Sequence, residues 1–137
     1  MARPLRSAAA VAFFVLMAGC AAVHEPGCAP GEDRSISDVL YFGRSRASGV
    51  VTSDEWAAFL RTSVTPRFPA GLTVWSASGQ WRNADGVIVR EDSFVLTLLH
   101  RDDETSDASV RAIVGEYKSR FDQESVLRVR SHTCVSF

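Results

Sequence analysis

The hydrophobic and polar positions between residues 52 and 69 predict a helix followed by a sharp turn. Thr52 and Glu55 have the capping-box spacing, in which each side chain accepts a hydrogen bond from the other's backbone N–H. Pro66 ends the helix, because a proline disfavours helical geometry at Thr65 before it. The apolar positions that follow the helical period, and that we expect to face the core, are Trp56, Phe59, Leu60 and Val64.

Four other runs of apolar residues predict strands at 37–44, 71–75, 87–100 and 126–135. The first and third runs are apolar on both faces, which is typical of strands at the centre of a sheet. In the fourth run Leu127 and Val129 alternate with Arg128 and Arg130, a pattern typical of an edge strand whose polar face is wet. Asp-Gly at 85–86 predicts the turn between the second and third strands.

A second helix is predicted after the third strand, with Ser106 as its N-cap and Asp107 placed to suit the helix dipole. Its apolar stripe is Val110, Ile113, Val114, Tyr117 and Phe121. The element order is therefore β-α-β-β-α-β. With right-handed crossovers, this order predicts an α+β ferredoxin-like sandwich. Its four-stranded antiparallel sheet has the order 4-1-3-2, with two helices on one face. We expect one domain, at 36–137.

The first 19 residues have the pattern of a signal peptide: Arg3 and Arg6 precede an uncharged apolar run that is too short to span a bilayer. The run ends in Leu-Met-Ala-Gly before Cys20 and resembles a bacterial lipobox. This resemblance implies cleavage before Cys20 and several acyl chains on it, which together anchor a protein stably to a membrane. Ala21 favours the outer membrane, facing the periplasm. An ordinary signal peptide with a chance cysteine is the alternative.

Residues 20–35 are rich in proline and glycine and predict a flexible tether. If Cys20 carries lipid, Cys28 and Cys134 remain, and in an oxidising compartment we expect them to form a disulfide. In a chain-entropy model a loop of this length stabilises the fold by up to about 4–5 kcal/mol. The alternative is a small buried Cys134 and a free Cys28.

The charge balance argues against a nucleic-acid partner. The chain has 15 basic and 16 acidic residues, and removal of the leader leaves 13 basic against 16 acidic. The sequence contains no phosphate-binding glycine loop, no metal-ligand spacing and no nucleophile elbow, so we expect no cofactor. His24 falls in the tether, and His100 and His132 are single residues in strands. These three are interpreted as solvated or hydrogen-bonded side chains.

Several short motifs together resemble DUF3574, a bacterial family of unknown function. They are Leu40-Tyr41-Phe42-Gly43, 56–60, Val64-Thr65-Pro66-Arg67-Phe68-Pro69, Gly71-Leu72-Thr73-Val74, Gly79-Gln80-Trp81, Arg90-Glu91 and Cys134-Val135-Ser136-Phe137. The resemblance covers residues 40–137 and implies secreted or lipid-anchored bacterial proteins, without an activity, cofactor or partner. Arg44 departs from it, because an apolar residue is expected at that position.

One group of polar and aromatic residues is a candidate site: Arg67, Gln80, Trp81, Arg90 and Glu91, with Tyr41 nearby. The favoured interpretation is an internal ion pair between Glu91 and either Arg67 or Arg90. The other is an arginine in a small pocket that binds an anion, with Trp81 as the apolar wall.

Central strands that are apolar on both faces leave one apolar face uncovered by helices. We therefore expect a homodimer through this face, and a lipid-anchored envelope protein that acts as a binding or assembly module. The alternative is a cofactor-free enzyme of the dimeric α+β barrel type that acts on a small hydrophobic molecule. Only Glu91 or His100 could then serve as its general base.

Overall fold

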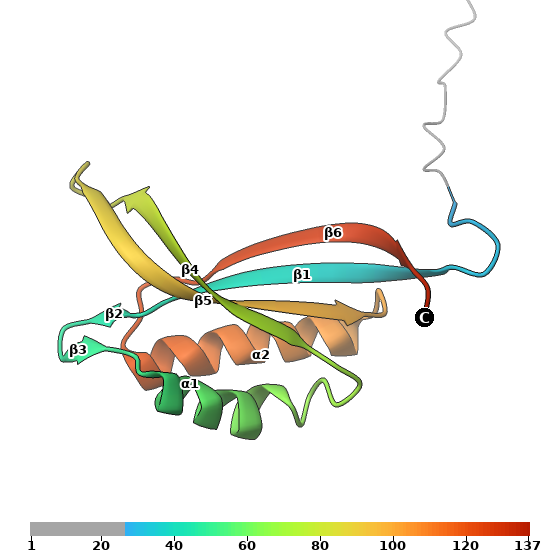
Figure 1. Ribbon diagram of the computed structural model, residues 1–137, viewed down its shortest axis with the longest axis horizontal. Helices are drawn as coiled ribbons and strands as arrows, with labels where there is room; N and C mark the ends of the chain where they lie inside the picture. Colours follow the sequence, from blue (N-terminus) through green and yellow to red (C-terminus); the bar gives the residue numbers. More distant parts are fainter. Residues whose placement is uncertain (1–26) are drawn as a thin grey trace, which may run out of the picture.

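A computed structural model describes residues 27–137 of the chain. The predicted signal peptide and Cys20 lie outside the described residues. Four strands form one sheet: β1 (Asp33–Gly43), β4 (Thr73–Arg82), β5 (Ile88–His100) and β6 (Leu127–Val135). Their order is β4-β5-β1-β6, and all neighbouring pairs are antiparallel. The helices α1 (Ser53–Phe59) and α2 (Glu104–Phe121) lie side by side on one face of this sheet (Figure 1).

The predicted architecture, an antiparallel four-stranded sheet with two helices, is confirmed, and the differences lie at the ends of the elements. β1 begins at Asp33, within the predicted tether, because it pairs there with the end of β6. The N-cap of α2 is Asp103 rather than Ser106, because the Asp103 carboxylate accepts the Ser106 N–H at 2.7 Å. Within residues 27–137, neither helix is long and apolar enough to cross a membrane.

The first helix begins and ends where the sequence predicts. The capping box is present, with Thr52 Oγ1 accepting from the Glu55 N–H at 3.2 Å and Glu55 accepting from the Thr52 N–H at 2.9 Å. A π-helical turn, η1 (Leu60–Val64), continues α1 up to the residue before Thr65-Pro66. The turn after η1 then leads the chain back to the sheet at β4.

The core lies between the helices and the face of the sheet that they cover. It consists of Leu40, Phe42, Val51, Trp56, Phe59, Val64, Phe68, Phe94, Leu96, Leu98, Val110, Ile113, Tyr117 and Phe121. The Trp56 ring stacks on Phe94 with 4.8 Å between centroids, and Tyr117 meets Phe42 edge-on at 4.6 Å. The Tyr117 hydroxyl donates to the Gly43 carbonyl at 2.9 Å, and burial raises the pKa of Tyr117. This hydrogen bond fixes α2 against the end of β1.

The predicted disulfide between Cys28 and Cys134 is present, with 5.5 Å between the two Cα atoms. It joins the segment before β1 to β6 and closes a loop of 106 residues. The core, the sheet and the disulfide all lie within residues 28–137, so the chain from Ala21 onward contains a complete domain with its own core.

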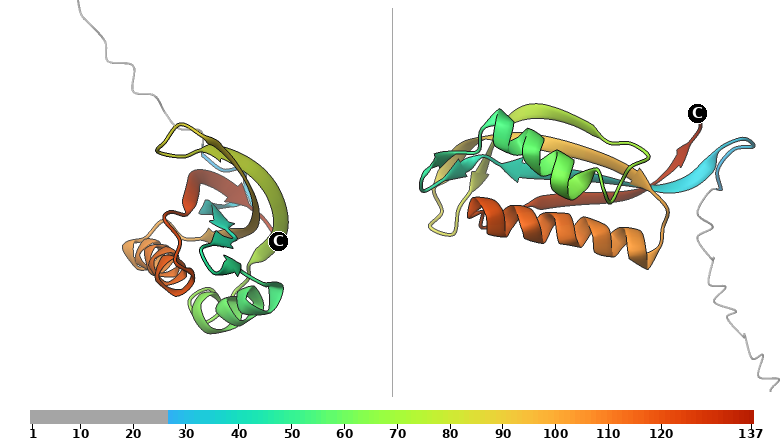
Figure 2. Two further views of the ribbon diagram at one scale, coloured as in Figure 1. Left: turned by 90° about the vertical axis from the view of Figure 1, so that its left-hand side faces the viewer. Right: turned by 90° about the horizontal axis from the view of Figure 1, so that it is seen from below.

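The sheet divides at one end. β1 pairs with β5 only as far as Gly43 and Ser93, whereas β5 and β4 remain paired out to Ile88 and Arg82. The β4–β5 hairpin therefore projects beyond the sheet, and β1 turns away into the short ribbon β2 (Ser45–Arg46) and β3 (Gly49–Val50). Figure 1 shows the two paths separating, and Figure 2 shows the hairpin arching away from the helices. We call the gap between residues 43–46 and this hairpin the fork.

Candidate functional site

Four of the five predicted site residues lie at the fork, on paired positions of the hairpin. Gln80 is opposite Arg90, and the neighbouring positions hold Trp81 and Glu91. Arg67 does not belong to this group. Its guanidinium forms a bidentate ion pair with Glu116 of α2 and donates to the Ser63 carbonyl at 2.6 Å.

The predicted ion pair between Glu91 and Arg67 or Arg90 is wrong for two reasons. Arg67 follows η1 in the helix layer, so the carboxylate beside it is that of Glu116 in α2. Arg90 precedes Glu91 in one strand, and successive side chains of a strand point to opposite faces. The Arg90 side chain has neither a hydrogen bond nor an ion pair to any residue of 27–137, and it remains exposed.

Glu91 instead bridges the fork. One carboxylate oxygen accepts the Ser45 N–H at 2.9 Å, and the other accepts the Trp81 indole N–H at 3.3 Å. Gly43 makes this approach possible, because a Cβ there would lie 2.7 Å from Glu91 Oε1. The glycine of the Leu-Tyr-Phe-Gly motif thus has a steric role: it admits the Glu91 carboxylate.

Two clefts adjoin at Glu91. The first, of about 720 Å³, is called the arginine cleft and is lined by Arg44, Ser45, Val50, Ser78, Gly79, Gln80, Arg90, Glu91 and Asp92. The second, of about 520 Å³, is called the aromatic cleft and is lined by Tyr41, Gly43, Ser45, Gly79, Gln80, Trp81, Val89, Glu91, Ser93, Asp122, Gln123, Glu124, Ser125 and Leu127. By strand alternation, Ser78, Arg90 and Asp92 project from the helix-facing side of the hairpin, and Trp81 and Val89 from the other.

Arg44 is the site residue that sequence reasoning missed. Its Nε donates to the Val51 carbonyl at 3.0 Å, and its guanidinium carbon lies 4.6 Å from the centroid of the Phe94 ring. Its terminal nitrogens make no hydrogen bond or ion pair with the described residues, and Arg44 lines the arginine cleft. The signal that could have found it is the basic residue at the end of a central strand, where the family resemblance leads one to expect an apolar side chain.

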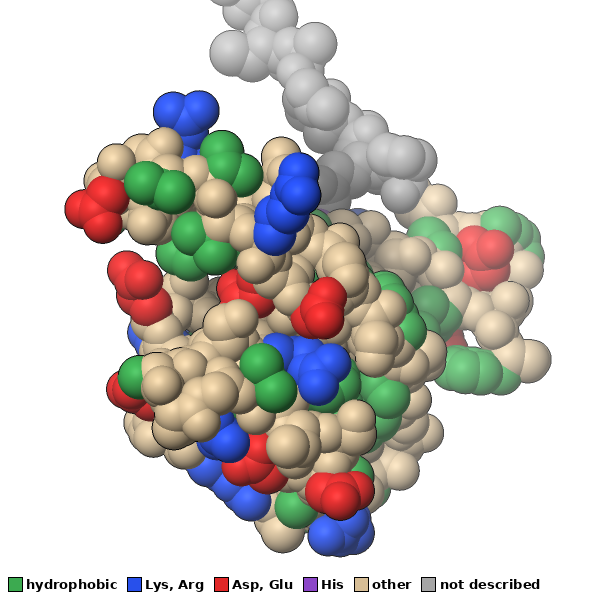
Figure 3. Space-filling model, turned by 60° about the vertical axis from the view of Figure 1, so that its left-hand side comes forward, with side chains coloured by type: hydrophobic (Ala, Val, Ile, Leu, Met, Phe, Trp, Pro, Cys, Tyr) green, Lys and Arg blue, Asp and Glu red, His purple; other side chains and the backbone are tan. Residues whose placement is uncertain are grey.

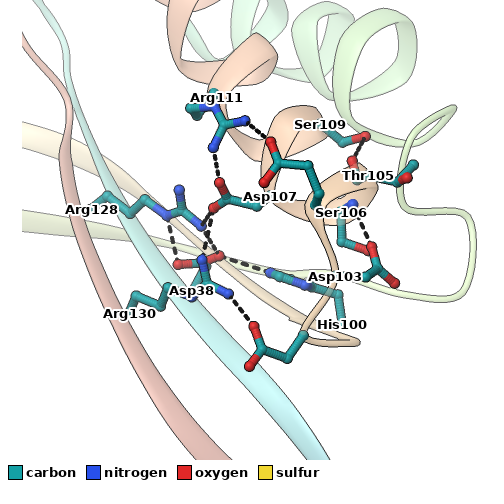
Figure 4. Close-up of polar contacts among 12 residues, drawn as sticks. Asp38, His100, Asp103, Thr105, Ser106, Asp107, Ser109, Arg111, Arg128 and Arg130 are labelled. Atoms are coloured by element: carbon teal, nitrogen blue, oxygen red, sulfur yellow. Dashed lines mark hydrogen bonds and ion pairs between the residues drawn. The ribbon is translucent and has the colours of Figure 1, made fainter.

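A second polar cluster lies at the opposite end of the same sheet, between β6 and the start of α2 (Figure 4). The fully buried Asp38 carboxylate accepts two hydrogen bonds from Arg128, at 2.7 and 2.6 Å, and one from His100 Nε2 at 2.8 Å. Arg128 also donates to Asp107 at 2.7 Å, and Arg130 joins Asp107 to Asp102. Burial alone would raise the pKa of Asp38, but these hydrogen bonds outweigh it and hold that pKa below its ordinary value.

This cluster corrects the orientation predicted for the last strand. Arg128 and Arg130 point toward α2, because the carboxylates of Asp38 and Asp107 lie there. The apolar residues between them, Leu127 and Val129, are therefore on the exposed face. His100 is only 4% exposed in its side chain, and both of its ring nitrogens have partners, Asp38 and the Arg101 carbonyl.

The face of the sheet opposite the helices, called the open face, carries two rows of side chains in register across all four strands. The first row is Leu127, Tyr41, Val95 and Trp75, and the second is Val129, Val39, Thr97 and Thr73. Leu127 is 60% exposed, Trp75 45% and Tyr41 38%. Neither row contains a charged residue.

Comparison with known proteins gives a family. The family model described as "Protein of unknown function (DUF3574)" matches residues 37–137. The chain belongs to this family. A search of curated proteins found no match.

Solved structures with a similar fold include two small proteins. A phage SAM lyase in complex with S-methyl-5'-thioadenosine is 15% identical, with a TM-score of 0.56 over 82% of this chain and 95% of the lyase. CutA from Synechococcus elongatus is 13% identical, with a TM-score of 0.53 over 75% of this chain and 80% of CutA. At these identities the likeness concerns the fold alone.

The two polar clusters differ in what they can do chemically. In the cluster around Asp38, the carboxylate and its partners satisfy one another within a buried network, so the cluster stabilises the fold. At the fork, the Arg90 side chain has no partner among the described residues, the terminal nitrogens of Arg44 make no hydrogen bond with them, and Glu91 is held in a fixed orientation. The fork is therefore the candidate site for a ligand.

Proposed function

We propose that this DUF3574 chain is a lipid-anchored protein of the bacterial cell envelope, with a ferredoxin-like domain that acts as a binding and assembly module. The observation that carries the proposal is the open face, where apolar side chains lie in register across four strands without a helix to cover them. Contiguous exposed apolar patches of this kind are typical of interaction sites.

The occupant that fits the open face best is a second copy of the chain. Its two rows contain apolar, threonine and aromatic side chains only, so two copies meet there without bringing like charges together. Removing apolar surface from water stabilises an interface by about 25 cal/mol per Å². Large side chains that are only half buried in one copy, such as Leu127 and Trp75, would supply this area.

Sedimentation of the chain from Ala21 onward, at tens of micromolar and without detergent, tests this interface. We expect a homodimer for the wild type and a monomer for Leu127→Lys. The variant should still unfold cooperatively on heating, with a midpoint lower than that of the wild type by no more than the loss of the dimer contact requires. The matched control is Val87→Lys, because Val87 is 57% exposed but lies in the hairpin turn rather than on the open face. A monomeric wild type would contradict the proposal.

The envelope location is supported by the leader and by the disulfide. Disulfides such as Cys28–Cys134 persist in oxidising compartments, which the periplasm is and the cytoplasm is not. The lipid anchor at Cys20 is tested by labelling cells with palmitate. We expect label on the wild-type chain and none on Cys20→Ala, and unchanged labelling of the variant would contradict the anchor. Fractionation of the labelled membranes would then test the preference for the outer membrane over the inner.

A cofactor-free enzyme is a second candidate, because Glu91 lines both clefts and is held in a fixed orientation. His100, the other candidate base, is buried with both ring nitrogens engaged. The phage lyase with a similar fold shows that such a scaffold can hold an enzyme. Native mass spectrometry of the wild type and Glu91→Gln, both purified from periplasm, tests the alternative. Retention of a small hydrophobic molecule by the variant alone would support turnover, and no such difference would count against it.

A further inference from the structure

We propose that the fork binds a small zwitterion, whose oxyanion pairs with Arg44 and Arg90 and whose ammonium group lies against Glu91 and the Trp81 ring. This inference goes beyond the proposed function and depends on neither the lipid anchor nor self-association. The fork is visible in Figure 3 as the hollow between the projecting hairpin and the body of the molecule, with acidic and basic side chains on its walls.

The two arginines of the arginine cleft would bind the oxyanion end of the ligand. Arg44 is positioned by its hydrogen bond to Val51 and by the Phe94 ring beneath it, which leaves its terminal N–H groups free to donate. Arg90 comes from the opposite wall and has no protein partner among the described residues. A guanidinium binds the paired oxygens of a carboxylate or phosphate through parallel hydrogen bonds, so this pair fits an oxyanion.

The aromatic cleft would bind the ammonium end of the ligand. Its charged lining residues are Glu91, Asp122 and Glu124, and it contains no lysine or arginine. Trp81 and Tyr41 also line it, and an aromatic face attracts a cation through its quadrupole, most strongly when the ring is that of tryptophan. The indole N–H of Trp81 donates to Glu91, so the carboxylate and the ring are held together as one surface.

The charge balance favours a zwitterion over a simple anion or cation. Two arginines and four carboxylates line the two clefts together. A simple anion at Arg44 would face Glu91 and Asp92 in the same cleft, and a simple cation at Glu91 would leave both arginines unpaired. Glu91, Gln80, Gly79 and Ser45 line both clefts, so the two ends of the proposed ligand would meet at this shared wall. Tyr41 and Leu127 belong also to the open face, but the arginine cleft contains neither.

Isothermal titration of the oxidised chain from Ala21 onward tests the proposal with three probes: O-phosphoethanolamine, inorganic phosphate and ethanolamine. We expect O-phosphoethanolamine to bind at least about tenfold more tightly than either half, because each charged hydrogen-bond set contributes separately. Equal binding of phosphate alone or of ethanolamine alone would overturn the zwitterion. So would the absence of O-phosphoethanolamine binding at about millimolar concentration.

Two variants should differ in their effect on phosphate binding, a difference that a folding defect would not produce. Arg90→Gln should weaken the binding of both phosphate and O-phosphoethanolamine at least about tenfold. Glu91→Gln should weaken the binding of O-phosphoethanolamine, because the ammonium group loses its carboxylate. It should leave phosphate binding equal or stronger, because it removes a negative charge near the phosphate. The matched control is Arg82→Gln, which makes the same change on the same hairpin outside both clefts. Equal loss in Arg90→Gln and Arg82→Gln would overturn the proposal.

The same samples separate this inference from the proposed function. Sedimentation measures self-association, and the titration measures ligand binding. A monomer that binds O-phosphoethanolamine would support the site but not the dimer, and a dimer that does not bind it would support the dimer but not the site. Backbone amide shifts on binding should concentrate at Gly43, Ser45 and Gly79. Shifts confined to residues outside the fork would contradict the site.

Discussion

The two faces of the sheet are built from alternate residues of the same strands, yet they differ in what covers them. On the helix face Leu40, Phe42 and Leu96 are fully buried under α1 and α2. On the open face Tyr41, Leu99 and Val129 are also apolar but remain between 38% and 47% exposed. Figure 2 shows both helices on the same side. The difference indicates that one face stabilises the folded chain and that the other is available for association.

The polar residues repeat this contrast. Asp38 is on the helix face, where burial would be unfavourable for a lone carboxylate, and Arg128 and His100 compensate it. Arg90 is on the projecting hairpin, where solvent hydrates it without a partner. The buried Asp38 carboxylate therefore needs its protein partners for stability, whereas the exposed Arg90 guanidinium is free to bind a ligand.

The largest effect is expected from Asp38→Asn. This change removes the buried negative charge and replaces one of the two acceptor oxygens facing Arg128 and His100 by an NH2 donor, so it should lower the free energy of unfolding by about 3–5 kcal/mol. Denaturant titration of the chain from Ala21 onward measures it. The control is Asp92→Asn in the exposed hairpin, which should change the free energy by less than about 1 kcal/mol. Equal effects of the two changes would remove the distinction between the clusters.

The same substitution on the two faces sharpens the comparison. Leu40→Ala opens a cavity under the helices and should lower the free energy of unfolding by about 2–5 kcal/mol. Leu127→Ala on the open face should cost less than about 1 kcal/mol in the monomer, because that side chain is already largely in water. Denaturant titrations at protein concentrations too low for dimer formation measure the free energy of unfolding of both variants. A large loss from Leu127→Ala in the monomer would mean that the open face stabilises the single chain.

The pH dependence of stability should contain a contribution from Asp38. Its pKa is lowered in the folded chain, so its stabilisation is present above the unfolded pKa of about 3.9 and is lost as pH falls through the folded pKa. In this acidic window one such group gives a slope of up to about 1.4 kcal/mol per pH unit. Denaturant titrations at a series of acidic pH values should show a shallower slope for Asp38→Asn than for the wild type. Parallel slopes would refute the assignment.

The smallest effect is expected from Arg67→Gln. The ion pair of Arg67 with Glu116 is partly exposed, so its loss should lower the free energy of unfolding by no more than about 1 kcal/mol. The sedimentation mass and the binding of O-phosphoethanolamine should stay unchanged. Loss of O-phosphoethanolamine binding in this variant would contradict the placement of Arg67 outside the fork.

Local patterns in the sequence were sufficient for most of the elements. The capping box and Pro66 gave both ends of the first helix, because both act through neighbouring backbone atoms. The doubly apolar strands are indeed the central ones, β1 and β5. Cys28 and Cys134 could be paired by elimination, because the lipobox accounts for the third cysteine.

Long-range charge pairing could not be predicted in the same way. Alternation in the last strand distinguishes an apolar face from an arginine face, but an arginine face can contact either water or buried carboxylates. The carboxylate partner of Arg128 is Asp38, which lies 90 residues away in the sequence, so no local pattern connects the two. The fork is similar, because Glu91 reaches Ser45 across 46 residues of sequence. The chemistry of an arginine and a carboxylate suggests pairing Arg67 with Glu91, but it does not identify which carboxylate is near, and α2 supplies the partner.

Native mass spectrometry of the chain from Ala21 onward, exported to bacterial periplasm and purified without reductant, is the decisive test of assembly through the open face. We expect twice the mass of one chain, lowered by two hydrogens per chain for the Cys28–Cys134 disulfide. We further expect that Leu127→Lys gives the mass of one chain, with the disulfide intact. A wild type that remains monomeric at tens of micromolar, or a dimer that persists in Leu127→Lys, would contradict assembly through the open face.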